Sequence, residues 1–437
     1  MPPPSAAARD HALDSLRGFA MFLGILLHAA ISFMDRPPAF WPVRDDAPTP
    51  LADALLLATH DFRMQLFFLL AGYFGCLLHR RYGTGGMLRH RIERVAIPFA
   101  LALLFVTPTV QAVFLCGEID NVRAVEVRSD PSPLRDFAAR LVAESPEAST
   151  GRLVLERFTS GEFITLLHPI HLWFLYYLLF LYAAVALLAP LLGRLDGTAF
   201  LARFDAGFRQ WIGGYGRIAV PALLTFPLML PMNWVVDTPA AWSPRWHVLA
   251  YYGWFFAFGW MLFRHRDLTV SFGRGWRMNL IAANAVVLPA LLVLVIRGTT
   301  AERAAEDATA TKLAASLASV AYTWLMIAGL WGAFLHYFRR ERAWVRYLAD
   351  ASYWCYLASL TPIVAFQFWV KDWPVPAVVK FAVVTGLSLL VLLASYEWCV
   401  RYTIIGAILN GRKRRGISKQ PFDIPCPPVS VSATLSA

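Results

Sequence analysis

Residues 14–29 read DSLRGFAMFLGILLHA, an apolar run with Arg17 near its start and His28 near its end. A membrane-spanning helix needs about 20 largely apolar residues, and the run continues apolar to Met34. The eleven-residue spacing between Arg17 and His28 brings both to one face of a helix, roughly 16 Å apart along its axis. Asp14, three residues before Arg17, is placed to pair with it. Because ionisable groups inside a membrane are costly, this pattern indicates a functional helix.

The rest of the chain predicts an all-α, polytopic membrane protein. Of its 437 residues, 58% are hydrophobic and only 16% are charged, too few to coat even one soluble domain of this length. About ten segments are long and apolar enough to span a bilayer. They are Leu16–Met34, Phe62–Leu78, Val95–Cys116, His168–Leu192, Ile218–Val236, His247–Phe263, Asn279–Ile296, Leu317–Phe338, Tyr347–Val370 and Pro376–Val400.

The basic residues predict the orientation of these ten helices. The net charge is +11. If the N-terminus is cytoplasmic, the two termini and every second connection between helices are cytoplasmic as well, and these segments hold 24 of the 40 Lys and Arg residues. Such an excess obeys the positive-inside rule, so we expect both termini in the cytoplasm. The same rule accounts for the positive net charge, so we expect no nucleic-acid partner. The five cysteines show no CxxC spacing, which argues against a disulfide framework or a zinc site.

This topology divides the chain into three parts. Residues 1–15 are a cytoplasmic segment without the features of a signal peptide, and 16–409 form the transmembrane domain. Within that domain, 117–167 is a long external loop. Residues 410–437 are rich in Pro and Ser and are predicted to be a disordered cytoplasmic tail.

Two further polar clusters lie at the outer ends of predicted helices. HDFRMQLFFLLAGYF, at 60–74, carries His60, Asp61 and Arg63 before Gly72, a position that favours close helix packing. The alternative is a charge cluster that merely ends the helix.

HPIHLWFLYYLLFLY, at 168–182, carries His168, His171 and Trp173. An interfacial aromatic belt is the alternative for Trp173. Two histidines without a Cys or Asp ligand beside them do not predict a metal site.

At the inner end of the third predicted helix, MLRHRIERVAIPFA (87–100) places Arg91 and Arg94 three residues apart. Guanidinium groups bind phosphate through a planar fork, so this pair is a candidate phosphate site. Ordinary positive-inside charge is the alternative. For His28 and Arg17 the alternatives are a packing histidine and a snorkelling interfacial arginine.

Taken in order, these stretches resemble the acyltransferase 3 family of integral membrane acyltransferases. The resemblance begins with the Arg17-x10-His28 spacing, continues through FRMQLFFLLAGYF and the Arg91-x-x-Arg94 pair, and ends with ASYWCYLAS at 351–359. It covers residues 13 to about 400 and is closest to the branch that succinylates periplasmic glucans. Relatives often have a histidine where this chain has Ser359, which leaves the role of that histidine open here.

The resemblance implies an enzyme of the bacterial inner membrane that moves an acyl group, succinyl or acetyl, from a cytoplasmic donor to hydroxyls of a periplasmic or cell-surface glycan. The donor would be acyl-CoA, a substrate and not a permanently bound cofactor. By motif, His28 would be the catalytic histidine with Arg17 as its partner, and Arg91 with Arg94 would bind the donor. Asp14, from its spacing to Arg17, is expected to belong to the same catalytic group. We expect the acceptor near the outer polar residues, His60, Arg63, His168, His171 and Trp173. A histidine suits general-base catalysis because its pKa is near neutrality.

The competing interpretation is a secondary transporter of a small anionic or sugar-like solute. Transporters also contain intramembrane charge and helices broken by Gly or Pro. They usually consist of matching halves, however, and no later segment repeats the pattern of the first helix. Loss of an acyl group from the surface glycans of a deletion strain would distinguish the enzyme from the transporter.

Overall fold

The computed structural model describes residues 11–38, 40–124, 133–161, 164, 167–194, 197–239, 241–299 and 305–411, and every regular element in these ranges is a helix. The α-helices are α1 His11–Ala30, α2 Pro50–Arg91, α3 Ile97–Arg123, α4 Pro133–Glu144, α5 Thr150–Thr159, α6 Trp173–Gly193, α7 Ala199–Gly213, α8 Gly216–Met229, α9 Trp246–Arg264, α10 Thr269–Phe272, α11 Trp276–Ile281, α12 Leu288–Thr299, α13 Ala305–Tyr337, α14 Ala343–Ala358, α15 Leu360–Val370, α16 Ala377–Ser395 and α17 Ile404–Asn410. Short 3₁₀ segments are η1 Ile31–Phe33, η4 Ile170–Leu172 and η5 Arg266–Leu268, and π-helical segments are η2 Ile92–Ala96, η6 Ala282–Val287 and η7 Tyr396–Val400.

Six helical runs in the described part of the chain are long and apolar enough to cross a membrane. A seventh results if α7 and α8, which meet at an angle of 116°, are counted as one broken span. The run Pro50–Arg123 contains both the second and the third segment predicted from the sequence. Several long apolar helices are what a polytopic membrane protein requires. The number of ten spans and the cytoplasmic location of both termini stay predictions.

Three of the ten predicted segments, 218–236, 247–263 and 347–370, lie outside these six unbroken runs. The segment 218–236 contains α8, which has Pro221 and Pro227 inside it and only 14 residues, fewer than the roughly 20 that a span needs. The segment 347–370 is interrupted at Ser359, between α14 and α15. Pro362 explains the interruption, because it has no N–H to bond to the carbonyl one turn earlier.

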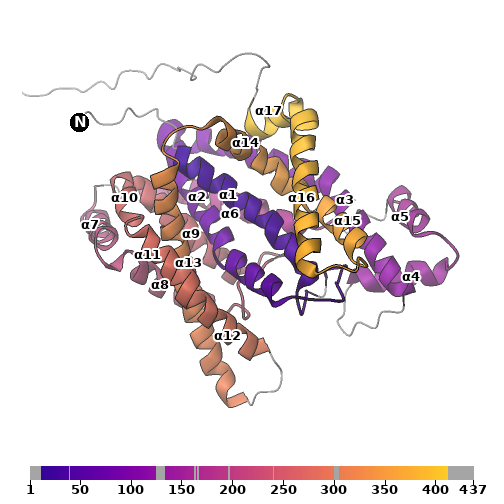
Figure 1. The fold of residues 1–437 in the computed structure, drawn as a ribbon. Helices are drawn as coiled ribbons and strands as arrows, with labels where there is room; N and C mark the ends of the chain where they lie inside the picture. The colour runs from indigo at the N-terminus through magenta and orange to yellow at the C-terminus, as the bar shows by residue number, and fades with distance from the viewer. Residues whose placement is uncertain are drawn as a thin grey trace, which may run out of the picture.

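Helix α1 lies at the centre of the molecule. It packs against α2, α13, α14, α15 and α16, and Figure 1 shows it running between them. Its closest neighbour is α14: a Cβ added to Gly18 would lie 3.0 Å from the Cα of Ala349. The helix that carries the Arg17-x10-His28 pattern is therefore held by partners from both ends of the chain.

Glycines fix the crossing of α2 and α9, the most extensive helix pair of the fold. A Cβ added to Gly72 would overlap the carbonyl oxygen of Phe256, and one added to Gly259 would overlap that of Leu69. The two helix backbones can approach this closely because Gly72 on α2 and Gly259 on α9 have no side chains, a kind of contact that is typical of helix pairs in membranes. The close packing predicted at Gly72 is confirmed.

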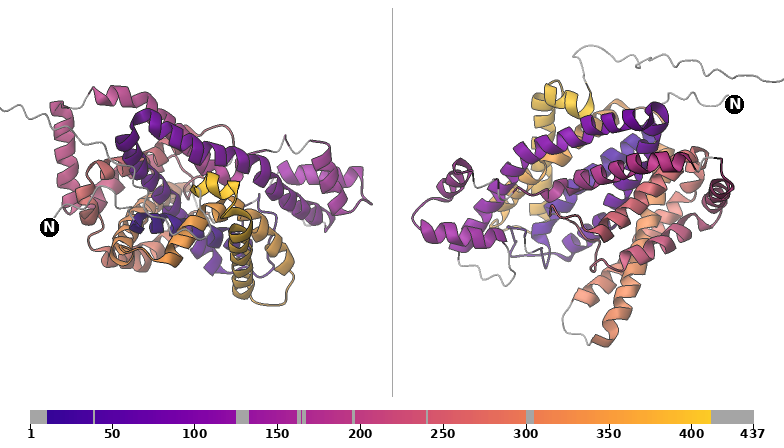
Figure 2. Two further views of the ribbon diagram at one scale, coloured as in Figure 1. Left: turned by 90° about the horizontal axis from the view of Figure 1, so that it is seen from above. Right: turned by 180° about the vertical axis from the view of Figure 1, so that it is seen from behind.

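Helices α4 and α5 lie at one edge of the molecule, against the far end of α3 (Figures 1 and 2). They share a small apolar core with α3, made of Leu115, Ile119, Phe137, Ala138, Leu153 and Val154. The predicted external loop thus contains two helices. Residues 1–10 and the predicted tail from 412 onward lie outside the described residues.

Candidate functional site

His28 lies in the last turn of α1, against an aromatic side chain from the following connection. The indole of Trp41 stacks on its imidazole, with ring centroids 6.0 Å apart and planes 3° from parallel. Trp41 is 1% exposed, whereas His28 keeps some accessible surface. The ring is therefore held from one side, and its Nδ1 is a buried nitrogen without a hydrogen-bond partner among the described residues.

Gln367 of α15 connects His28 with Trp41. Its Nε2 donates to the carbonyl oxygens of His28 (3.0 Å) and Ala29 (3.1 Å), which have no intrahelical donor at the end of α1. Its Oε1 accepts from the Trp41 Nε1–H at 3.1 Å. One amide side chain therefore fixes both the end of α1 and the indole that covers the histidine.

The connection from α1 to α2 is anchored by a buried ion pair. Asp45 and Lys380 of α16 are 2.7 Å apart, with side chains 1% and 5% exposed. Lys380 also donates to the carbonyl of Lys371, and the N–H of Asp45 donates to the carbonyl of Ser32. These bonds fold the connection back over the end of α1, which brings Trp41 to His28.

Arg63 of α2 reaches the same face of α1 one turn before His28. Its Nη1 is in contact with Gly24, where a Cβ would overlap it. His28 interacts electrostatically with Arg63, and also with His171 and His60. The structure therefore brings together four of the predicted site residues, from three separate segments.

The outer histidines differ in their surroundings. His171 is buried and donates from Nε2 to the carbonyl of Leu357 (2.9 Å), close to the break between α14 and α15, while the Tyr356 hydroxyl donates to the His171 carbonyl (2.8 Å). His168 is exposed. Trp173 is buried in the apolar core, where its ring lies 5.3 Å from that of Tyr252. Within the described ranges, no three His, Cys, Asp or Glu side chains converge in a way that could hold a metal ion.

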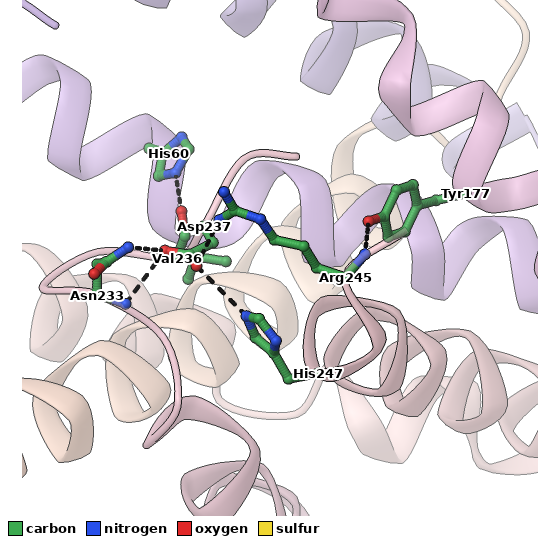
Figure 3. A network of polar contacts seen from close by, with 7 residues as sticks. All are labelled: His60, Tyr177, Asn233, Val236, Asp237, Arg245 and His247. Carbon is green, nitrogen blue, oxygen red and sulfur yellow. Dashed lines mark hydrogen bonds and ion pairs between the residues drawn. The ribbon is translucent and has the colours of Figure 1, made fainter. Parts of the chain in front are cut away.

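His60 leads to a polar network in the connection between α8 and α9 (Figure 3). Its Nε2 donates to the carbonyl of Val236 at 2.8 Å. The neighbouring Asp237 accepts from the side chain of Asn233 at 2.7 Å and lies 3.3 Å from Arg245. Figure 3 shows these groups, with His247 at 3.5 Å, gathered around the one carboxylate.

A cationic cluster lies toward the opposite end of α1. Arg17 is 3.7 Å from Asp14, as predicted. Tyr353 of α14 interacts electrostatically with Arg17, Arg91 and Arg94. The fold therefore gathers the three predicted arginines around one phenol.

Arg91 and Arg94 nevertheless make different contacts. The guanidinium of Arg91 lies 4.6 Å from the centre of the Tyr182 ring, and its Nε and Nη2 have no hydrogen-bond partner among the described residues. Arg94 donates to the carbonyls of Ala407 (2.8 Å) and Ile408 (2.6 Å), in α17. Because η2 is a π-helical turn with i→i+5 bonding, the two side chains do not keep the spacing of an ordinary helix.

Three residues of this site were not among the sequence predictions. Trp41 lies in a connection without helical periodicity, so no pattern indicates it. Asp237 follows a predicted span and resembles an ordinary helix-end charge. Gln367 could have been found, because it is an amide inside an otherwise apolar segment.

Residues 10–397 match a family described as an acyltransferase domain. The chain is also similar to the proteins named glucans biosynthesis protein C of Shigella dysenteriae serotype 1 (strain Sd197) and Escherichia coli O1:K1 / APEC, with 35% identity to each over 104 residues. The aligned region covers 24% of this chain and 26% of each relative. No solved structure matches this fold.

Proposed function

Because this chain belongs to the acyltransferase 3 family, whose domain spans residues 10–397, we propose that it moves an acyl group from acyl-CoA in the cytoplasm to hydroxyls of a periplasmic or cell-surface glycan. The similarity to glucans biosynthesis protein C supports a glucan as the acceptor. The observation that carries the proposal is the placement of His28: Trp41 stacks on its ring, Gln367 bonds to its backbone, and its Nδ1 has no hydrogen-bond partner among the described residues. The chain would lie in the bacterial inner membrane, with ten spans and both termini in the cytoplasm.

In this mechanism His28 acts as the general base. A sugar hydroxyl is a poor nucleophile until its proton is removed, and such assistance typically gives a rate increase of about 10²–10⁴-fold. The hydroxyl proton moves to His28 as the hydroxyl oxygen attacks the thioester carbonyl carbon. The carbon–sulfur bond then breaks, and the leaving thiolate takes the proton from His28.

The donor enters at the cationic cluster. Arg91 has unoccupied guanidinium N–H groups, and Arg17 and Arg94 add positive charge nearby. Guanidinium groups suit the phosphates of coenzyme A because their planar fork binds two oxygens. From Arg17 to His28 the distance along α1 is roughly 16 Å, which the extended pantetheine arm would bridge.

The acceptor enters from the other end of α1. His168 is exposed there, and His60, His171 and Arg63 lie deeper, around His28. The Asp237 network offers further hydrogen-bonding groups to a sugar. Trp173, by contrast, is packed in the core and would shape the site without touching the acceptor.

The test is acyl transfer by the purified protein in detergent, with acyl-CoA donors and periplasmic glucan, followed by mass spectrometry of the glucan. We expect ester formation by the wild type and none by His28→Ala. His336→Ala, which changes an exposed histidine of α13, is the matched control. Unchanged glycan decoration in a deletion strain that has lost uptake of a solute would instead show a transporter.

A further inference from the structure

We propose that Arg63 binds the acyl carbonyl oxygen and stabilises the oxyanion that forms when the sugar hydroxyl attacks at His28. This inference rests on the proposed function and gives it a second catalytic residue. The oxyanion is a new negative charge that must form beside His28, deep in the bundle, and His28 itself neutralises the other one, the leaving thiolate. A preorganised cation at that point is usually among the largest contributions to catalysis.

The first observation is the position of the guanidinium group. Arg63 Nη1 touches Gly24, which stands one helical turn before His28. Residues four apart in a helix project from the same face, so the guanidinium and the imidazole face the same space. The absence of a side chain at Gly24 is what allows the guanidinium to lie there.

The second observation is the absence of a counter-ion. Within the described residues no carboxylate lies within ion-pair distance of Arg63, and its Nε has no hydrogen-bond partner. Its electrostatic neighbours are the phenols of Tyr252 and Tyr356. An unpaired cation in a protein interior is costly, so its presence favours a transient anionic partner.

The adjacent carboxylate does not fill this role. Asp61 interacts with Ser319 of α13 and with Tyr322, on a different face of α2 from Arg63. The backbone carbonyl of Asp61 accepts from the Thr323 hydroxyl, which ties this part of α2 to α13. Arg63 therefore points away from α13 and toward α1 with its charge unbalanced.

The chemistry balances with these two groups. His28 takes the hydroxyl proton, the hydroxyl oxygen bonds to the carbonyl carbon, and the carbonyl π electrons move to the oxygen that Arg63 binds. When the intermediate collapses, the electron pair returns, the carbon–sulfur bond breaks, and the thiolate receives the proton from His28. Arg63 only donates hydrogen bonds, and stays protonated throughout.

The experiment compares Arg63→Ala, Arg63→Lys and Gly24→Ala with wild type, measuring kcat, donor affinity and thermal unfolding. Gly24→Ala adds a methyl group that displaces the Arg63 guanidinium without removing it. Gly386→Ala is the matched control, because a Cβ there meets nothing within 4 Å.

We expect Arg63→Ala to lower kcat by about 10²–10³-fold with little change in donor affinity. Lys should restore part of the rate, since it keeps the charge but loses the planar fork. Gly24→Ala should also lower kcat, and combining it with Arg63→Ala should cause no further loss, because both act through one group.

If a folded Arg63→Ala or Gly24→Ala protein has an unchanged kcat, the proposed role of Arg63 is overturned. The proposed acyltransferase function is still supported in that case, provided that the wild-type protein transfers the acyl group. A loss confined to the affinity for donors with a carboxylate on the acyl group would also overturn it, and would make Arg63 a carboxylate-binding residue. A folded wild-type protein that transfers no acyl group would refute the proposed function itself.

Discussion

The indole of Trp41 lies nearly parallel to the imidazole of His28, and the side-chain amide of Gln367 bonds to the indole and to the backbone of His28 at once. A base that is held by its neighbours loses little freedom when the substrate binds, which favours a productive geometry in the bound complex. Neither Trp41 nor Gln367 needs to touch the reacting atoms to have this effect. Both are therefore positioning residues.

We predict that Gln367→Met lowers kcat by about 10–100-fold, because a displacement of about 1 Å at a catalytic group has effects of this size. Methionine has a similar volume but cannot donate to the carbonyls of His28 and Ala29 or accept from Trp41. Trp41→Phe should have a smaller effect on kcat, since it keeps an aromatic ring beside His28, although it loses the indole N–H and the volume of the second ring. Steady-state kinetics with saturating acyl-CoA measure this, and a fall in donor affinity without a fall in kcat would contradict it.

The ion pair of Asp45 and Lys380 gives a second prediction, on stability. Removing one partner of a buried pair leaves an uncompensated charge, which typically costs about 3–5 kcal/mol. Asp45→Ala should therefore strongly lower the unfolding temperature in detergent. The double variant Asp45→Asn with Lys380→Met should be more stable than Asp45→Ala, because neither remaining side chain is charged. Equal unfolding temperatures for wild type and Asp45→Ala would show that the pair contributes nothing.

The crossing of α2 and α9 gives a third prediction. Gly72→Ala or Gly259→Ala would drive a methyl group into a backbone carbonyl of the partner helix, which cannot yield as a side chain tip can. Overpacking usually costs about 1–3 kcal/mol. Each variant should unfold at a lower temperature than Gly386→Ala, where the new methyl group meets open space. If both glycine variants unfold at the wild-type temperature, α2 and α9 can move apart to accommodate a methyl group without loss of stability, which would contradict the prediction.

Several of these features were predictable because they depend on local spacing. The apolar periodicity of the first helix places Arg17 and His28 on one face whatever surrounds it. The pair Asp14–Arg17, three residues apart, is confirmed at 3.7 Å. Such contacts form within one helix, so no knowledge of the tertiary structure is needed to expect them.

The remainder of the site depends on contacts between distant segments. Trp41 meets Gln367 across 326 residues of sequence, and Asp45 meets Lys380 across 335. Nothing in the local pattern of either segment specifies its partner. The divergence of Arg91 and Arg94 also depends on a local departure from α-helical geometry, since the π-helical turn η2 changes the spacing that a regular helix would give.

Because Arg91 and Arg94 make different contacts, we expect them to contribute differently to binding of the acyl donor. Arg91 has guanidinium N–H groups without partners, whereas Arg94 already donates to two carbonyls of α17. Loss of a hydrogen bond to a charged group is worth about 1.5–3 kcal/mol, or about 10–100-fold in affinity. Arg91→Ala should weaken acyl-CoA binding by that factor at nearly unchanged stability. Arg94→Ala should mainly lower the unfolding temperature, because the end of α17 loses its donor.

Replacing both arginines by lysine keeps the charge but loses the fork that binds two phosphate oxygens. The double lysine variant should therefore bind acyl-CoA more weakly than wild type, and the double alanine variant more weakly still. Affinity for the glucan should be unchanged in both, because the acceptor binds toward the His28 end of α1. Acyl-CoA binding to the purified proteins, measured by calorimetry beside wild type, decides the matter. If the donor affinity is the same in all three proteins, the two arginines only set the topology of the chain and the phosphates are bound elsewhere.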